Sequence, residues 1–133
     1  MDKKVESILR FEDYIVKEVK FVINETFSER KNVQLVFSIR PKVKIDKNKL
    51  RISLETEIFE DAKKNDFPFE MYVSIIGKFN TSGEDVNKFI PNAIAILYPY
   101  VRAIVSTYTA QANVNALILP PINVNKLISE NSK

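Results

Sequence analysis

The sequence predicts an α+β fold in which a four-stranded antiparallel sheet is followed by a short and a long helix packed on one face. Two observations support this prediction. Apolar and polar residues alternate in four segments between residues 14 and 79, and apolar residues recur at helical spacing within residues 91–111. Because 133 residues with 45% hydrophobic content can enclose one core, we expect a single domain over residues 1–133.

The two central strands alternate most clearly. They flank a turn-like segment, Asp46-Lys47-Asn48-Lys49, so we expect a long hairpin. The inward positions are Val33, Leu35, Phe37, Ile39, Val43 and Ile45 before the turn, and Leu50, Ile52, Leu54, Thr56 and Ile58 after it.

A further strand is expected on each side of this hairpin in the chain. The first, residues 14–24, has the inward positions Ile15, Val19, Phe21 and Ile23, and the fourth, residues 67–79, has Phe69, Met71, Val73 and Ile75. Four strands in succession favour an antiparallel meander, in which each strand pairs with the next. One apolar face of such a sheet needs a cover, which the rest of the chain must supply.

Two helices are expected after the strands. Ser82 and Asp85 have capping-box spacing, which predicts a short helix that begins near residue 83 and stops at Pro91. The second helix, residues 91–111, is expected to bend at Pro99. Its apolar stripe comprises Ile94, Leu97, Tyr98, Val101, Ile104, Val105 and Tyr108.

The opposite side of the second helix lacks the Lys and Glu residues of a water-facing surface. Between residues 91 and 125 Arg102 is the only charged residue, although charged residues make up 28% of the chain. Each large apolar side chain left in water forfeits about 1.5–3 kcal/mol, so we expect this side to meet another subunit. The predicted oligomer-interface residues are Ala95, Ile96, Ala103, Ser106 and Ala110.

Enzyme chemistry is disfavoured, because the chain has neither cysteine nor histidine. This removes thiolate chemistry, the commonest general base at neutral pH and the commonest zinc ligands. Glu55 and Glu57 share a solvated strand face, which offers no closed cleft for acid–base catalysis. With only Gly77 and Gly83, a glycine-rich phosphate loop is excluded. We therefore expect a binding protein with no catalytic residue, no metal site and no cofactor.

Two segments within residues 91–125, the stretch in which Arg102 is the only charged residue, resemble the C-terminal half of the SecB family of export chaperones. Residues 91–102 read PNAIAILYPYVR, and residues 117–123 read LILPPIN. In that family an aromatic-Pro-Tyr-x-Arg helix precedes a Leu-x-Leu-x-Pro-x-Asn segment, and four strands precede two helices. The resemblance covers roughly residues 8–128 and includes a C-terminal return at residues 117–128.

The resemblance implies a homotetramer, a dimer of dimers, whose hydrophobic grooves hold unfolded or non-native polypeptides without nucleotide or catalysis. It also implies protein export through the SecA motor or, in relatives, the shielding of an antitoxin. Arg40, Lys42 and Lys44 make SecA docking doubtful, because an export chaperone is acidic at that surface. The loop at residues 111–116 also lacks the Gly-x-Phe-Pro of the family.

Aromatic residues are the candidate walls of the client-binding groove. Phe59 and Tyr72 are expected opposite the core-facing residues of their own strands, and Phe79, Phe89 and Tyr100 where the end of the sheet meets the two helices. Core packing is the alternative for each of them.

Other functions stay open: a dedicated partner-binding adaptor, a toxin–antitoxin-associated chaperone, or a nucleic-acid-binding protein. The basic residues Arg40, Lys42, Lys44, Lys47 and Lys49 suggest nucleic acid, but a net charge of +3 and neighbouring glutamates disfavour it. The mixed-charge N-terminus shows no secretion signal, and prolines and polar residues interrupt residues 91–125. We therefore expect a cytoplasmic protein without membrane insertion.

Overall fold

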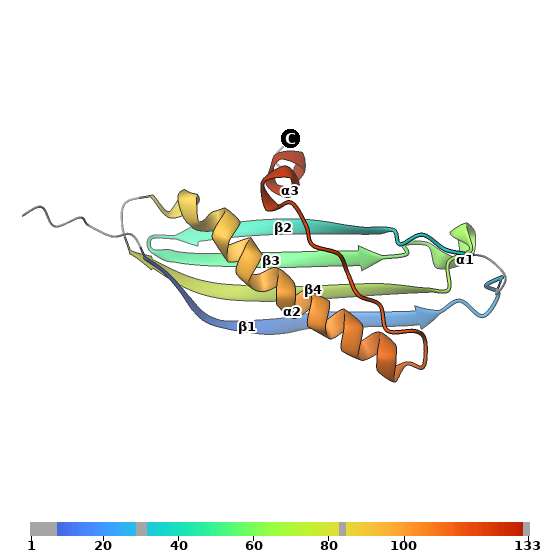
Figure 1. The fold of residues 1–133 in the computed structure, drawn as a ribbon. Coiled ribbons are helices and arrows are strands. Elements are labelled where there is room, and N and C mark those ends of the chain that lie inside the picture. Colours follow the sequence, from blue (N-terminus) through green and yellow to red (C-terminus); the bar gives the residue numbers. More distant parts are fainter. Residues whose placement is uncertain (1–7, 29–31, 83–84, 132–133) are drawn as a thin grey trace, which may run out of the picture.

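The computed structural model describes residues 8–28, 32–82 and 85–131, which form one sheet with helices on one face (Figure 1). The strands are β1 (Ile8–Ile23), β2 (Phe37–Asp46), β3 (Lys49–Ile58) and β4 (Phe69–Ser82). The helices are α1 (Ala62–Asn65), a 3-10 turn (Val86–Phe89), α2 (Ile90–Gln111) and α3 (Val124–Asn131). The predicted α+β fold class is confirmed.

The strands lie in the spatial order β1-β4-β3-β2, and every neighbouring pair is antiparallel. β2, β3 and β4 form a meander, but β1 lies on the far side and pairs with β4, from Ile8 opposite Ser82 to Ile23 opposite Phe69. The expected meander of all four strands is therefore wrong, and the arrangement is a Greek key. Alternation along one strand shows which face is buried, but it does not identify the neighbouring strand.

The predicted inward residues of β3 and β4, the two inner strands of the sheet, are confirmed. In β3 the side chains of Leu50, Ile52, Leu54, Thr56 and Ile58 are 0% exposed, and in β4 those of Phe69, Met71, Val73 and Ile75 are at most 4% exposed. Central strands keep strict alternation because both neighbours hold them in register.

The first strand departs from its prediction. β1 begins at Ile8, earlier than expected, and carries irregularities between Phe11 and Asp13 and between Val16 and Glu18. Each irregularity interrupts the alternation. Ile15, predicted to face inward, instead lies opposite Ile76 on the helix-free face and is 48% exposed. Ile23 does share the face of the buried Phe69 but is 45% exposed.

The second strand begins at Phe37 rather than at Val33. Its inward position Ile39 is 6% exposed, whereas Val43 and Ile45, on the same face, are 42% and 40% exposed. The helices therefore cover only part of the apolar face at this edge.

The start of the helical region also differs from the prediction. Asp85, not Ser82, caps the 3-10 turn, since its Oδ1 accepts a hydrogen bond from Asn87 N at 3.1 Å. The Ser82 hydroxyl oxygen instead accepts from Ile8 N at 3.2 Å. Pro91 does not end a helix: it lies in the first turn of α2, where a missing N–H leaves no bond unmade. The remaining residues of the predicted cap, Gly83 and Glu84, lie outside the described residues.

Helix α2 crosses the sheet diagonally and forms the second layer of the core (Figure 1). Its buried residues are Ala93, Ile94, Leu97, Tyr98, Val101, Val105 and Thr109, which include most of the predicted stripe. The helix approaches β4 so closely at Gly77 that a Cβ there would overlap the Leu97 side chain. By length and composition the segment Val86–Gln111 could span a membrane, but here it packs on the sheet through this stripe.

Candidate functional site

Residues 117–123, which we call the return segment, are held on α2 by three side chains of that helix. Arg102 Nε donates to Leu119 O at 2.8 Å, and Tyr98 donates its hydroxyl proton to Pro120 O. Thr109 Oγ1 accepts from Leu117 N at 2.8 Å and donates to Val105 O at 2.7 Å. Burial raises the pKa of the Tyr98 phenol, so the phenol remains a hydrogen-bond donor at neutral pH. The Tyr98–Arg102 pair of the sequence motif therefore fixes the path of the return segment.

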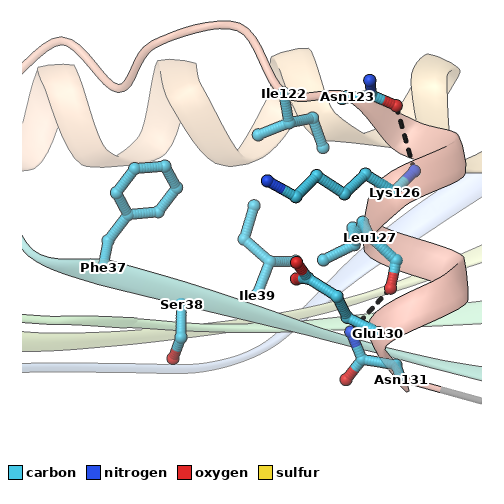
Figure 2. A pocket seen from close by; sticks show the side chains of 9 residues that line it. All are labelled: Phe37, Ser38, Ile39, Ile122, Asn123, Lys126, Leu127, Glu130 and Asn131. Carbon is cyan, nitrogen blue, oxygen red and sulfur yellow. Dashed lines mark hydrogen bonds between the residues drawn. The ribbon is translucent and has the colours of Figure 1, made fainter. Parts of the chain in front are cut away.

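The return segment leads into α3, which lies at the β2 edge of the sheet. A groove of about 450 Å³ lies between α3 and β2. Figure 2 shows Phe37 and Ile39 rising from β2 toward Ile122, Lys126 and Leu127. Asn123 orients the start of α3, because its Oδ1 accepts from Lys126 N at 3.0 Å. The remaining lining residues are Ser38, Asn123, Glu130 and Asn131. The groove thus has an apolar floor and a polar rim with both signs of charge.

The groove lies beside a free strand edge. Among the described residues β2 pairs with β3 alone, and Val36 O accepts from Phe59 N at 2.9 Å, which shows that even-numbered positions point their backbone groups at β3. Odd-numbered positions, including Phe37 and Ile39, therefore point their N–H and C=O groups away from the sheet. Pro41 is an odd-numbered position and has no N–H, as is typical of an edge strand. β2 can accept a further strand next to the groove, with one donor missing at Pro41.

A second set of apolar residues is exposed along β1 and α2. Ile8, Ile15, Val16, Val22 and Ile23 of β1 are 43–58% exposed. On α2, the predicted interface residues Ala95, Ile96, Ala103 and Ala110 are exposed, and Ser106 is partly buried. A long edge strand with several exposed apolar residues beside a charge-poor helix face is typical of a protein–protein interface.

The structure separates the five aromatic residues that were predicted to line a groove. Phe59 follows the end of β3 with φ 54°, so the alternation of β3 does not continue through it. It is 5% exposed, with its ring centroid 4.8 Å from that of Phe67 and 5.2 Å from that of Phe69. Phe59 therefore lies in the core rather than opposite it.

Tyr72 lies on the helix-free face, as alternation predicts. Its hydroxyl donates to Glu55 Oε2 at 2.6 Å, and Lys42 Nζ lies 2.8 Å from Glu55 Oε1. The hydrogen bonds from Lys42 and then Tyr72 lower the pKa of the Glu55 carboxyl group. Burial, and then the hydrogen bond to the carboxylate, raise the pKa of Tyr72.

The other three predicted residues lie near the junction of sheet and helix. Phe79 is 1% and Phe89 is 7% exposed, so both are core residues. Tyr100 is partly buried, and its ring centroid is 4.3 Å from that of Tyr14 and 5.7 Å from that of Phe11, which also contacts Phe79. Phe79 and Tyr100 thus belong to one aromatic cluster, whereas Phe59 and Tyr72 lie apart from it and from each other.

The groove beside α3 was not found from the sequence. Leu127 and Ile122 lie in a segment that the sequence marked only as a C-terminal return, and α3 is short and rich in polar residues. The spacing of Val124, Leu127 and Ile128 is the one signal that could have indicated a helix there. Among the described residues, no three Asp or Glu side chains are grouped closely enough to hold a metal ion.

The fold and groove define the class of protein: an α+β domain with a groove of apolar floor and polar rim beside the edge strand β2. The family model described as "Preprotein translocase subunit SecB" matches residues 8–133. The chain therefore belongs to the SecB family.

The chain is also similar to individual proteins. An uncharacterised protein of Methanocaldococcus jannaschii is 34% identical over 131 residues, which cover 93% of this chain and 84% of that protein. The Mycobacterium tuberculosis SecB-like chaperone, solved with a ChAD peptide from an antitoxin, has a TM-score of 0.71 at 14% identity, covering 86% of this chain and 91% of that one. A Streptococcus agalactiae protein of unknown function has a TM-score of 0.60 at 14% identity, covering 88% of this chain and 100% of that one. These two structures share the fold.

Proposed function

We propose that this protein is a SecB-like chaperone, a holdase that binds unfolded or non-native polypeptides as extended segments in the groove between β2 and α3. The observation that carries the proposal is the free edge of β2 directly beside an apolar floor. The family assignment supports it, and so does the peptide that the similar mycobacterial chaperone holds.

The chemistry of this groove suits many client sequences. Main-chain hydrogen bonds to the outward groups of Phe37 and Ile39 require no particular side chain, and alternate apolar side chains of the client would pack against Leu127 and Ile122. Lys126 and Glu130 place opposite charges on the rim, so neither acidic nor basic clients are excluded. Pro41 limits the ladder, because it donates no hydrogen bond.

The aromatic residues that the sequence predicted to line the groove have a secondary role in this proposal. Tyr72 and Tyr100 are partly exposed but lie outside this groove, so they would contact a client that extends beyond it. Phe59, Phe79 and Phe89 are buried in this protomer, so they would support the surfaces that a client touches.

We propose a homo-oligomer, a tetramer built as a dimer of dimers, that is held by the exposed edge of β1 and the charge-poor side of α2. Ala95, Ala103 and Ala110 allow a helix of another subunit to approach closely. Several grooves in one assembly would raise the affinity for a long client through avidity. Light scattering tests this proposal, and a monomer at micromolar concentration would refute it.

The activity proposed for this oligomer is the binding of polypeptides in the cytoplasm, without catalysis, in the service of protein export. An antitoxin chaperone or dedicated adaptor is the alternative, favoured by the antitoxin peptide in the mycobacterial structure. Suppressed aggregation of several unrelated denatured proteins supports the general holdase, whereas co-purification with one host protein supports the alternative. Docking to SecA stays doubtful.

The groove itself is tested by Leu127→Asp, which places a charge on the apolar floor. We expect this variant to lose suppression of aggregation while its far-ultraviolet circular dichroism is unchanged. Asn125→Asp is the matched control, because Asn125 is exposed on the same helix and does not line the groove. Equal activity of the two variants would refute the groove.

A further inference from the structure

On the face of the sheet that the helices do not cover, positive and negative residues gather at different positions along the strands. Near the turn between β2 and β3, five cationic residues lie on this face, one or two from each strand, and we call them the basic band: Arg10, Lys44, Lys49, Arg51 and Lys78. Lys47, in the turn itself, adds a further positive charge. Two carboxylates border the band, Asp46 opposite Lys49 and Asp13 opposite Lys78.

The centre of the band is a row of like charges. Lys44 is directly opposite Arg51, and Arg51 is directly opposite Lys78, so three cations lie side by side on β2, β3 and β4. Directly opposed like charges destabilise a sheet, because their Cβ atoms are only about 4.5–5.5 Å apart. Within the described part of the chain, no ion pair within 4.0 Å joins any band residue to a carboxylate.

The rest of this face carries carboxylates beside its cations, so the row does not simply reflect a general excess of lysine. Two positions along β2 from Lys44, Lys42 pairs with Glu55 at 2.8 Å. Farther along, burial and then the charge of Glu60 raise the pKa of Glu57, while Arg40 lowers it, so carboxylates and a cation lie together there. Of the basic residues noted in the sequence, Lys42 is thus paired with Glu55, whereas Lys44 lies opposite Arg51 in the row that β3 and β4 extend.

The band is also hollowed. A concavity of about 420 Å³ is lined by Lys44, Ile45, Asp46, Lys49 and Arg51. A second, of about 300 Å³, lies at the end of the sheet between the β2–β3 turn and the ends of β1 and β4, and is lined by Ile8, Arg10, Asn48, Lys49, Asn80, Thr81 and Ser82. An anionic chain that lies across the strands would pass from one hollow to the other.

We propose that the basic band is a docking surface for an acidic, extended polypeptide segment of a partner protein, separate from the groove beside α3. Across four strands the band spans about 15 Å, the length of roughly five extended residues. A nucleic-acid duplex fits less well, because its width would carry its phosphates toward the glutamates of the same face. Single-stranded nucleic acid would need aromatic stacking platforms, and the band contains none.

The test measures the binding of a fluorescein-labelled peptide of about six glutamates by anisotropy. We expect the wild-type protein to bind it in about 50 mM salt and to lose affinity on the order of tenfold in about 200 mM salt. Lys44→Glu/Arg51→Glu should abolish binding. Lys63→Glu/Lys64→Glu is the matched control, with the same change in net charge on exposed residues of α1, at the opposite end of the sheet (Figure 1).

A single variant separates lost binding from lost folding. Arg51→Glu replaces two like-charge pairs by opposite-charge pairs, so its denaturation midpoint should rise while its peptide affinity falls. Failure of the wild-type protein to bind the peptide in low salt, or equal loss in both double variants, would overturn the proposal. Tighter binding of a nucleic-acid duplex than of the peptide would overturn the choice of partner. Suppression of aggregation by the groove should be unchanged in Lys44→Glu/Arg51→Glu, which keeps the two proposals distinguishable.

Discussion

Replacing Arg102 by methionine would measure how firmly α2 holds the segment that forms the groove. Methionine keeps much of the apolar stem but removes the hydrogen bond from Nε to Leu119 O, which is 2.8 Å long. Hydrogen bonds to charged groups contribute about 1.5–3 kcal/mol, so the free energy of unfolding should fall by about that amount. Urea denaturation measures this change.

The same variant should act locally, because Arg102 holds the chain shortly before α3. Hydrogen exchange should become faster in residues 117–131 and stay unchanged in β3, and client binding should weaken together with the order of α3. Tyr98→Phe removes the neighbouring anchor and should cost about 0.5–1.5 kcal/mol, since that bond is between neutral groups. An Arg102→Met protein with wild-type unfolding free energy and wild-type exchange in α3 would refute this account.

Three further predictions follow from the packing, the charges and the exposed helix face. Gly77→Ala should destabilise the fold by about 1–3 kcal/mol in urea denaturation, because the added Cβ would overlap the Leu97 side chain. The double variant Gly77→Ala/Leu97→Ala should lose less stability than the sum of the two single variants. Additive losses would contradict the close approach of α2 to β4. Because the pKa of Glu55 is lowered in the folded protein, Glu55 stabilises the fold at pH values above its ordinary pKa of 4.5. This stabilisation is lost as the pH falls through the pKa of Glu55 in the folded protein, so Glu55→Gln should flatten the acid limb of a stability–pH curve. The raised pKa of Glu57 has the opposite sign, with stability lost as the pH rises through the folded value, so Glu57→Gln should steepen that limb; equal curves for the two variants would contradict both assignments. Ala103→Glu should reduce the mass measured by light scattering without changing the circular dichroism, and an unchanged mass would show that α2 is not at the interface.

The wrong and missing parts of the sequence prediction share a physical origin. Alternation placed the β3 and β4 side chains correctly, because both strands are central and regular. It misplaced Ile15, because an irregularity in β1 shifts the alternation, and it misplaced Phe59, because a positive φ ends the strand there. It could not place the groove, because Ile39 and Leu127 are far apart in the chain and meet only after α2 has positioned the return segment.

By itself the sequence determined the fold class, the buried faces of the central strands, the charge-poor helix and the family, because these depend on local periodicity and on a contiguous motif. The tertiary structure decided that β1 pairs with β4, which leaves β2 as a free edge beside α3. It also decided that Lys44, Arg51 and Lys78 form one row, while Lys42 is neutralised by Glu55. The pairing of β4 with β1 joins residues distant in the chain, so no pattern along the sequence specifies it, whereas the register within the β2–β3 hairpin follows from its turn.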